Sequence, residues 1–259
     1  QTPPGGSVKA AILLVVLVAT AIPVPMIVIP QNGSSIVTSK DRKSGWKAEW
    51  GMEQVQLQGK KAVRFTEKGT GRLSAYSQEV RWTAQSLWLA HDAFLPVETE
   101  KTVTASDGTV LLVERKNFDR GKGTVTVERR EAGKPAETES LDVPEDTLAI
   151  EGLAGVLRFA AVNESHSFST HVLTNEPKVY SVTFEWRGEE RVKTPAGEFE
   201  CYKLEMVPHL GVLNLFRPFL PRTYFWFSAA APHDWIRYQG PESGPGTPDV
   251  VMELSKSNH

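Results

Sequence analysis

Cysteine is almost absent from this chain of 259 residues, since Cys201 is the only one. A single cysteine excludes an intramolecular disulfide and any zinc site built from several cysteines. The fold must therefore be held by burial of apolar side chains, for which a hydrophobic content of 40% is sufficient. This composition suits a cytosolic protein and equally a bacterial exported domain, and it argues against a small secreted module framed by disulfides.

An excess of one charge is also missing, because 29 Lys and Arg residues face 31 Asp and Glu residues. Without a bulk positive field, a nucleic-acid partner is not predicted. The chain contains no G-x-S-x-G, Walker loop or dinucleotide fingerprint. The glycine-rich stretch 240–248 carries prolines that remove the N–H groups a phosphate cradle needs, so we interpret it as a connection between strands. No cofactor is predicted.

One apolar run, Ala10–Pro30, carries no charge and directly follows Lys9. Its first part, Ala10–Val18, has the length of a signal-peptide hydrophobic region, and Ala19-Thr20-Ala21 has the small-x-small pattern of a cleavage site. We therefore predict export to the periplasm or cell envelope, with cleavage after Ala21.

A retained membrane anchor is the alternative for this run, because its length approaches the roughly 20 residues of a spanning helix. Pro23, Pro25 and Pro30 disfavour the anchor, since proline removes helix hydrogen bonds that lipid cannot replace. The predicted organisation is residues 1–43 as signal peptide or anchor plus linker, and residues 44–259 as one β-rich envelope domain.

Short stretches of alternating polar and apolar residues follow each other from Ser44 to Leu254 and predict β-strands. Asp107-Gly108 predicts a hairpin turn, and Arg187-Gly188 predicts a turn or bulge. Such dense short strands predict a mainly β fold, with a curved antiparallel sheet that forms an open or half barrel. The strands include 101–105, 109–114, 123–129, 179–186, 199–206, 224–227, 235–238 and 250–254.

Helical periodicity occurs in one segment, Leu148–Ala161, with Asp146 as the expected N-cap. We expect this helix to cover the concave apolar side of the sheet. The side chains that can share its apolar face are Leu148, Leu153, Val156, Leu157 and Ala160.

Histidines beside carboxylates are the first candidates for chemistry, in His91-Asp92 and His233-Asp234. Neighbours in a strand point to opposite faces, so we interpret these pairs as turn residues at strand ends. A metal site formed by His166, His171 and His209 is an alternative to rim histidines, but their spacing matches no metal motif, and no metal is predicted. Cys201 is predicted to be a buried, inert thiol.

The candidate ligand-binding segment is apolar and lies between His209 and Pro221, where glycine and proline prevent a regular strand. Such a connection either caps the core, covers a cavity mouth, or contacts lipid or a partner. Its candidate ligand-binding residues are Leu210, Val212, Leu213, Leu215, Phe216, Phe219 and Leu220. A cavity lined by several of the seven tryptophans would bind an acyl chain.

The run 191–205, with its Thr194-Pro195-Ala196-Gly197 turn and Cys201, resembles an uncharacterised family of bacterial periplasmic β-domains. The hallmark of that family is T-P-A-G-x-[FY]-x-C-[YF]-K. The resemblance extends to Tyr224–Ser228 and Val250–Leu254, and the family is similar in fold to the lipoprotein carriers of the outer-membrane localisation pathway. This resemblance implies an envelope location, a sheet wrapped around a helix, and a hydrophobic ligand, without catalytic residues.

Three functions follow in order of preference. The first is a non-enzymatic periplasmic or envelope protein that binds a lipid or a lipoprotein acyl chain, with membrane contact as a further expectation. The second is a structural or interaction module with a filled core, anchored by an uncleaved N-terminal helix. The third is a hydrolase that uses His91 or His233.

Overall fold

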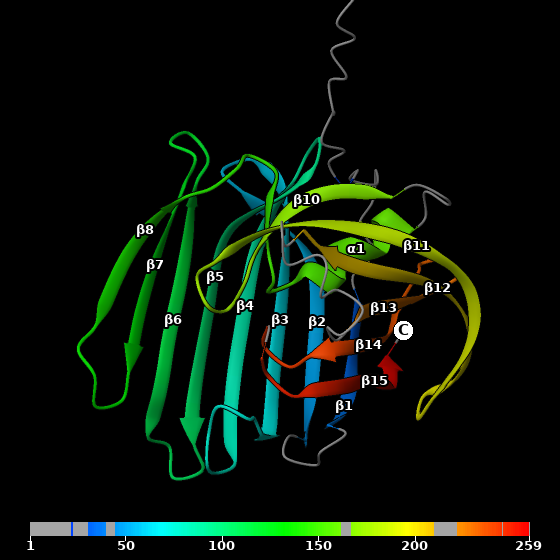
Figure 1. Cartoon of the computed structure of the whole chain (residues 1–259), viewed down its shortest axis with the longest axis horizontal. Coiled ribbons are helices and arrows are strands. Elements are labelled where there is room, and N and C mark those ends of the chain that lie inside the picture. Colours follow the sequence, from blue (N-terminus) through cyan, green and yellow to red (C-terminus); the bar gives the residue numbers. More distant parts are fainter. Residues whose placement is uncertain are drawn as a thin grey trace, which may run out of the picture.

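The computed structural model describes Ile22 and residues 31–39, 45–161, 167–209, 222–244 and 246–258. These residues form one 15-stranded sheet with the order β8-β7-β6-β5-β4-β3-β2-β1-β15-β14-β13-β12-β11-β10-β9 (Figure 1). The elements are β1 (Gln31–Ser39), β2 (Gly45–Leu57), β3 (Lys60–Arg72), β4 (Val80–Ala90), β5 (Phe94–Ala105), β6 (Val110–Asp119), β7 (Thr124–Glu131), β8 (Glu137–Asp142), β9 (Thr147–Ala149), α1 (Leu153–Ala161), β10 (Phe168–Leu173), β11 (Val179–Thr194), β12 (Gly197–Pro208), β13 (Thr223–Ser228), β14 (Trp235–Pro241) and β15 (Asp249–Asn258).

The sheet is strongly curved and remains open, with β8 and β9 at its two edges. Neighbouring strands run antiparallel, whereas β9 pairs with β10 in parallel. The curvature brings β9 back against β5, where Arg120 donates hydrogen bonds to the carbonyl oxygens of Pro96 (3.3 Å) and Thr147 (2.9 Å). The prediction of a mainly β, curved antiparallel sheet that stays open is confirmed.

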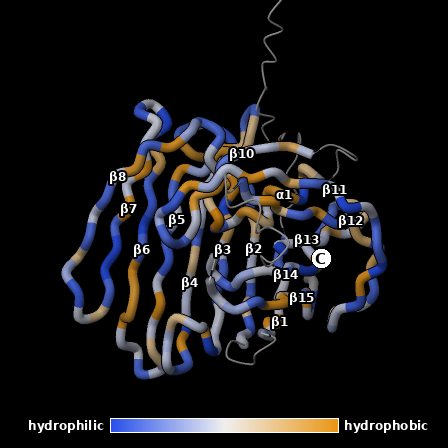
Figure 2. Tube along the Cα trace, in the orientation of Figure 1, coloured by the Kyte–Doolittle hydropathy of each residue, from blue (hydrophilic) through white to orange (hydrophobic). Residues whose placement is uncertain are grey.

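Helix α1 lies inside the curve of the sheet (Figures 1 and 2). Its side chains Leu153, Val156 and Leu157 are buried in the core. Two glycines let it approach the sheet closely. A Cβ at Gly155 would lie 2.0 Å from Phe65 Cε1, and one at Gly152 would lie 2.5 Å from Ser86 Oγ. The predicted covering helix is therefore present.

The predicted start of this helix was wrong. Leu148 lies in β9, and the helix begins only at Leu153, because Gly152 turns the chain with a φ of +81°. Asp146 is not its N-cap. Its carbonyl oxygen accepts a hydrogen bond from Thr170 Oγ1 (2.6 Å), and its carboxylate contacts His171.

Strand β1 lies in the segment that the sequence assigned to a linker, and it pairs with β2 on one side and β15 on the other. Its inward positions, Gln31, Gly33, Ser35 and Val37, are buried despite their mostly polar or small side chains. Gly33 is needed for close packing, since a Cβ there would lie 2.7 Å from the Trp50 ring. The sheet therefore begins before Ser44.

Turns and bulges agree well with the sequence patterns. Thr194 pairs with Gly197 across the two-residue turn Pro195-Ala196, and the β11–β12 register shifts between Trp186 and Glu189, which places the predicted bulge at Arg187-Gly188. The hairpin at Asp107-Gly108 also forms, although its connection has three residues, because Ala105 N donates to Thr109 O (2.8 Å).

The concave face carries two apolar clusters. The larger cluster packs around α1, and the smaller one contains Trp46 and Trp82, whose ring centroids lie 6.1 Å apart edge to face. Every second residue of β6 is buried on the concave face, and these residues are Leu112, Glu114, Lys116 and Phe118. The two charged side chains therefore separate the apolar regions of this face. The interior is therefore apolar in zones rather than throughout.

Candidate functional site

The candidate ligand-binding segment lies outside the described residues, which stop at His209 and resume at Arg222. This applies to Leu210, Val212, Leu213, Leu215, Phe216, Phe219 and Leu220. The candidate site formed by the described residues therefore lies elsewhere, in the interior of the sheet.

The histidine pairs have separate surroundings. His91 Nδ1 lies 2.9 Å from Asp92 Oδ2, and both side chains are exposed between β4 and β5. His233 stacks on Tyr202, with ring centroids 5.9 Å apart, and its Nδ1 lies 3.0 Å from the Ser228 carbonyl oxygen. Asp234 instead accepts a hydrogen bond from Gln31. The two residues of the His233-Asp234 pair therefore bond to different partners.

The remaining histidines do not gather either. His171 Nδ1 lies 2.7 Å from Asp146 Oδ1, and His209 Nε2 lies 2.7 Å from Thr183 Oγ1, while His166 falls outside the described residues. Within the described part of the chain, no three His, Cys, Asp or Glu side chains are placed to hold a metal ion.

Cys201 is buried, and burial raises the pKa of its thiol to about 12 despite the opposing effect of Arg237. We expect iodoacetamide at about pH 8 to leave Cys201 unmodified in the folded protein and to alkylate it after unfolding in urea, because only the thiolate reacts. Mass spectrometry measures this, with Asp107→Cys in the exposed β5–β6 turn as the reactive control in a Cys201→Ala background. Equal rates for the two cysteines in folded protein would contradict an inert thiol.

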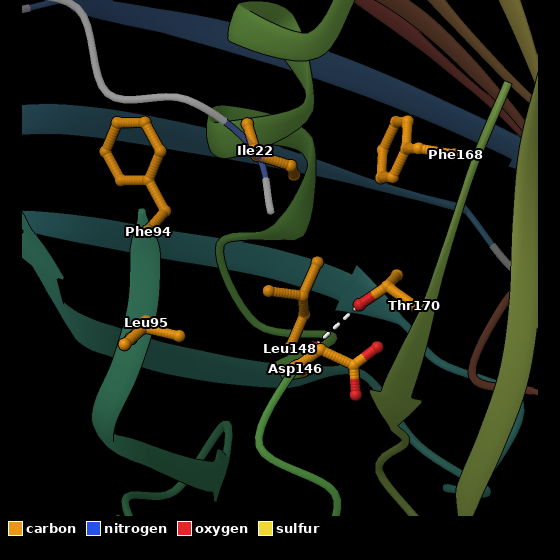
Figure 3. A pocket seen from close by; sticks show the side chains of 7 residues that line it. All are labelled: Ile22, Phe94, Leu95, Asp146, Leu148, Phe168 and Thr170. Carbon is orange, nitrogen blue, oxygen red and sulfur yellow. Dashed lines mark hydrogen bonds between the residues drawn. The ribbon is translucent and has the colours of Figure 1, made fainter. Parts of the chain in front are cut away.

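A small cavity lies in the larger apolar cluster, between the start of β5, β9 and β10 (Figure 3). Its volume is about 20 Å³, and its lining is mostly aliphatic or aromatic. The ring of Phe94 stacks on Phe159 of α1 at 5.0 Å, and Phe168 stacks on Phe184 at 5.1 Å. The lining residues are Ile22, Phe94, Leu95, Asp146, Leu148, Phe168 and Thr170.

The two polar lining residues already have partners. Thr170 Oγ1 donates to the Asp146 carbonyl oxygen, and the Asp146 carboxylate pairs with His171. A molecule entering the cavity would therefore meet apolar side chains and no polar group in need of a partner. Such a surface selects for hydrocarbon, because an unpaired polar group of the ligand would lose its hydration there.

A wider hollow of about 360 Å³ opens to solvent near the ends of β1, β2 and β3. Its lining includes Trp46 and Val37 together with the charged side chains of Lys47 and Glu79. Because it is open and partly charged, it is less suited to enclose an apolar ligand than the interior beside α1.

A buried polar relay joins α1 to two distant parts of the sheet. Arg158 Nη1 donates to Gln31 Oε1, and Gln31 Nε2 donates to Asp234 Oδ1. Burial lowers the pKa of Arg158 to about 10, and Asp234 counteracts this effect, so the guanidinium stays charged at neutral pH. The relay fixes the last turn of α1 against β1 and the β13–β14 loop.

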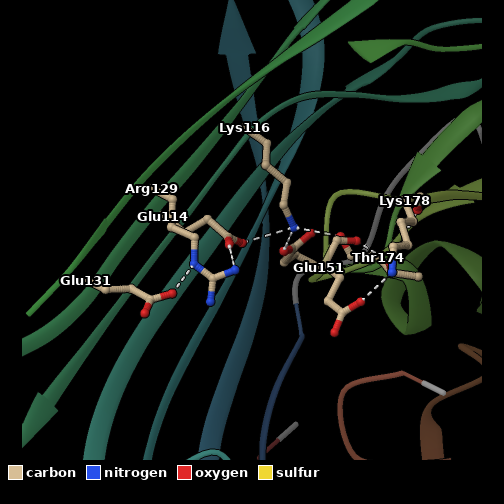
Figure 4. Close-up of polar contacts among 8 residues, drawn as sticks. Glu114, Lys116, Arg129, Glu131, Glu151, Thr174 and Lys178 are labelled. Carbon is tan, nitrogen blue, oxygen red and sulfur yellow. Dashed lines mark hydrogen bonds and ion pairs between the residues drawn. The ribbon is translucent and has the colours of Figure 1, made fainter. Parts of the chain in front are cut away.

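A second buried cation, Lys116, lies on the concave side of β6 and has no exposed side-chain surface (Figure 4). It pairs with Glu151, just before α1, and lies 3.2 Å from Glu114 Oε1. Its Nζ also donates to the Thr174 carbonyl oxygen at 3.3 Å. Burial lowers its pKa, but the two carboxylates outweigh burial and the net pKa is raised. These contacts connect strand β6 to Glu151, just before α1, and to Thr174, just after β10.

Most of the interior site was not predicted from the sequence. The alternation along β6 could have identified Glu114 and Lys116 as interior residues, because they lie on the same face of the strand as the apolar Leu112 and Phe118. No local signal indicates that Ile22 joins Phe94 in the interior, since the two lie far apart along the chain.

Residues 45–254 match the DUF3108 family model, described as a protein of unknown function, and the chain belongs to this family. No curated protein matches it in sequence. Among the described residues, no helix has both the length and the apolar character needed to cross a membrane.

Three solved structures resemble this chain. A beta-barrel-like protein of the domain of unknown function DUF1849 from Brucella abortus has a TM-score of 0.53 and 9% identity, covering 89% of this chain and 97% of its own. A protein from Bacteroides fragilis with a YmcC-like fold, provisionally assigned as exported, has a TM-score of 0.35 and 11% identity over 93% of this chain and 100% of its own. A protein from Parabacteroides distasonis, provisionally assigned as a lipoprotein, has a TM-score of 0.35 and 9% identity over 93% and 99%. The first likeness reflects the fold alone, and the other two are too distant to support an inference.

Proposed function

We propose that this protein is a non-enzymatic, exported envelope protein that holds one alkyl chain, from a lipid or an acylated lipoprotein, in the interior beside α1. The observation that carries this proposal is the cavity between Phe94, Leu148 and Phe168, whose two polar lining residues are bonded elsewhere. The predicted signal sequence, with cleavage after Ala21, supports export.

A structural module with a filled core is the second candidate. The small volume of the cavity, about 20 Å³, favours it, since this is room for little more than one water-sized group. The two candidates differ in one measurable property, which is whether the folded protein takes up an alkyl chain in solution.

We expect the delipidated protein to bind a fluorescent long-chain fatty acid that palmitate displaces. Leu148→Phe fills the cavity and should weaken binding about tenfold or more, which corresponds to roughly 1.4 kcal/mol. Titrations followed by fluorescence measure this, with separate arms for palmitate and a palmitoylated peptide to distinguish a free lipid from a lipoprotein chain.

The matched control is Leu112→Phe, the same substitution at a buried leucine of the smaller apolar cluster. Circular dichroism verifies that both variants fold. Binding that Leu148→Phe and Leu112→Phe weaken equally would place the ligand elsewhere, and no binding by the folded wild-type protein would favour the filled module.

A further inference from the structure

Strands β5 and β9 lie against each other where the curved sheet returns on itself, and we call this contact the seam. Strand β5 pairs with β4 and β6, and the three-residue β9 pairs with β10. Between these two fully described strands, no backbone hydrogen bond crosses the seam. Separation of the sheet at the seam would therefore leave every strand ladder intact, whereas separation of two neighbouring strands would break a ladder.

The side chain of Arg120 supplies hydrogen bonds to both sides of the seam. Its Nη2 donates to the Pro96 carbonyl oxygen of β5 at 3.3 Å and to the Thr147 carbonyl oxygen of β9 at 2.9 Å. Its Nη1 donates to the Glu145 carbonyl oxygen, just before β9, at 2.7 Å. The planar guanidinium therefore joins β5 to β9 through several donors in a fixed arrangement, which a lysine ammonium does not offer.

The cavity of the proposed alkyl site borders the seam. Leu95, next to Pro96, and Leu148, next to Thr147, both line it (Figure 3). The cavity of about 20 Å³ holds no more than one water-sized group, so an alkyl chain can enter only if the walls move apart. Separation of β5 from β9 is a movement that would widen it, because Leu95 and Leu148 belong to opposite sides of the seam.

We infer that the seam is the entrance to the interior site, and that Arg120 holds the seam closed. This inference rests on the proposed function and adds the route by which the alkyl chain reaches the interior. Arg120 is a positioning residue here, since it bonds to carbonyl oxygens of both strands and is not among the residues that line the cavity.

Cysteine labelling measures opening of the seam without a ligand. In a Cys201→Ala background, Arg120→Met should make Leu148→Cys react with maleimide about tenfold or more faster, because local opening then breaks fewer bonds. The matched control is Leu204→Cys in β12, since Leu148 and Leu204 are 4% and 3% exposed. The labelling rate of this control should change by less than about twofold, because β12 lies far from the seam in the strand order.

Arg120→Lys is the second variant, and it carries the same comparison if Arg120→Met does not fold. It keeps the charge but has a single donor group, so it should accelerate labelling of Leu148→Cys less than Arg120→Met does. Circular dichroism verifies folding. Equal acceleration of Leu148→Cys and Leu204→Cys would indicate a general loss of stability and overturn the role of Arg120 at the seam. Unchanged labelling of Leu148→Cys would overturn it as well.

Stopped-flow fluorescence tests whether the seam is the entrance. A fluorescent long-chain fatty acid should bind Arg120→Met about tenfold faster than wild-type protein, because a larger fraction of the variant is open. Faster labelling of Leu148→Cys without faster binding would overturn the entrance and leave the proposed function intact. Absence of binding to the wild type would overturn the proposed function, and the labelling rates would still show whether Arg120 holds the seam closed.

Discussion

Replacing Lys116 by methionine is expected to lower the free energy of unfolding by about 3–5 kcal/mol. The side chains of Glu114 and Glu151 are only 5% and 10% exposed, and both would lose their buried cation. Urea denaturation at neutral pH measures the change. Adding Glu151→Gln should recover part of the loss, because Glu151 is then no longer a buried carboxylate without its cation, whereas Glu114 Oε2 still lies 3.8 Å from Arg129 Nη1.

The matched control is Lys122→Met, which removes an exposed lysine that pairs with Asp119 at 2.9 Å in the β6–β7 turn. An exposed pair contributes about 0–1 kcal/mol, so this variant should remain close to wild type. Equal losses of unfolding free energy in the two lysine variants would show that the buried ion pairs of Lys116 do not stabilise the contact between β6 and the segment that precedes α1.

The pH dependence of this difference has a defined sign. The pKa of Lys116 is raised in the folded state, so its stabilising effect is fully present below the unfolded lysine pKa of about 10.4. The effect is lost as the pH rises from there through the folded pKa. The stability difference between wild type and Lys116→Met should therefore be constant from neutral to mildly alkaline pH and shrink above it.

Gly152→Ala is expected to lower the free energy of unfolding by about 2–4 kcal/mol, from a left-handed backbone strain and from overpacking. Gly152 has a φ of +81°, and its new Cβ would lie 2.5 Å from Ser86 Oγ and 2.9 Å from Trp88 Nε1. Ser86 and Trp88 are buried and hydrogen-bonded to each other at 2.9 Å, so they cannot move without loss. Chemical denaturation measures this change.

Gly59→Ala is the control that separates strain from packing. Its φ of +78° is almost the same, but nothing lies within 4 Å of the added Cβ. We expect a loss of only about 1–2 kcal/mol there. If the two alanine variants lost equal stability, close packing of α1 on β3 and β4 would not be the reason for glycine at position 152.

The sequence predicts the fold well where neighbouring strands are also neighbours along the chain. Alternation and turn residues are local signals, and the Thr194–Gly197 pair and the bulge at Arg187-Gly188 follow from them. Strand β1 escaped prediction because Gly33 and Ser35 have low strand preference, and their positions depend on packing against Trp50 and on pairing with β15. The start of α1 was misplaced because Leu148 fits both the helical and the strand periodicity. Its pairing with Val172 of β10 places Leu148 in a strand.

The candidate site was less predictable for the same physical reason. Ile22 meets Phe94, and Arg158 reaches Gln31 and Asp234, through contacts between distant segments that leave no periodic pattern in the chain. The predicted ligand-binding segment between His209 and Pro221 remains a prediction, as does its role beside the interior site.

The claim that the interior holds one alkyl chain is tested most directly by native mass spectrometry of the protein purified from a bacterial envelope. For the wild type we predict a chain that begins at Ile22 and carries the added mass of one lipid or acyl group. The Leu148→Phe variant should lack this added mass, and the Leu112→Phe variant should keep it. Bare protein in repeated preparations, with no added mass in the wild type under gentle ionisation, would contradict the account.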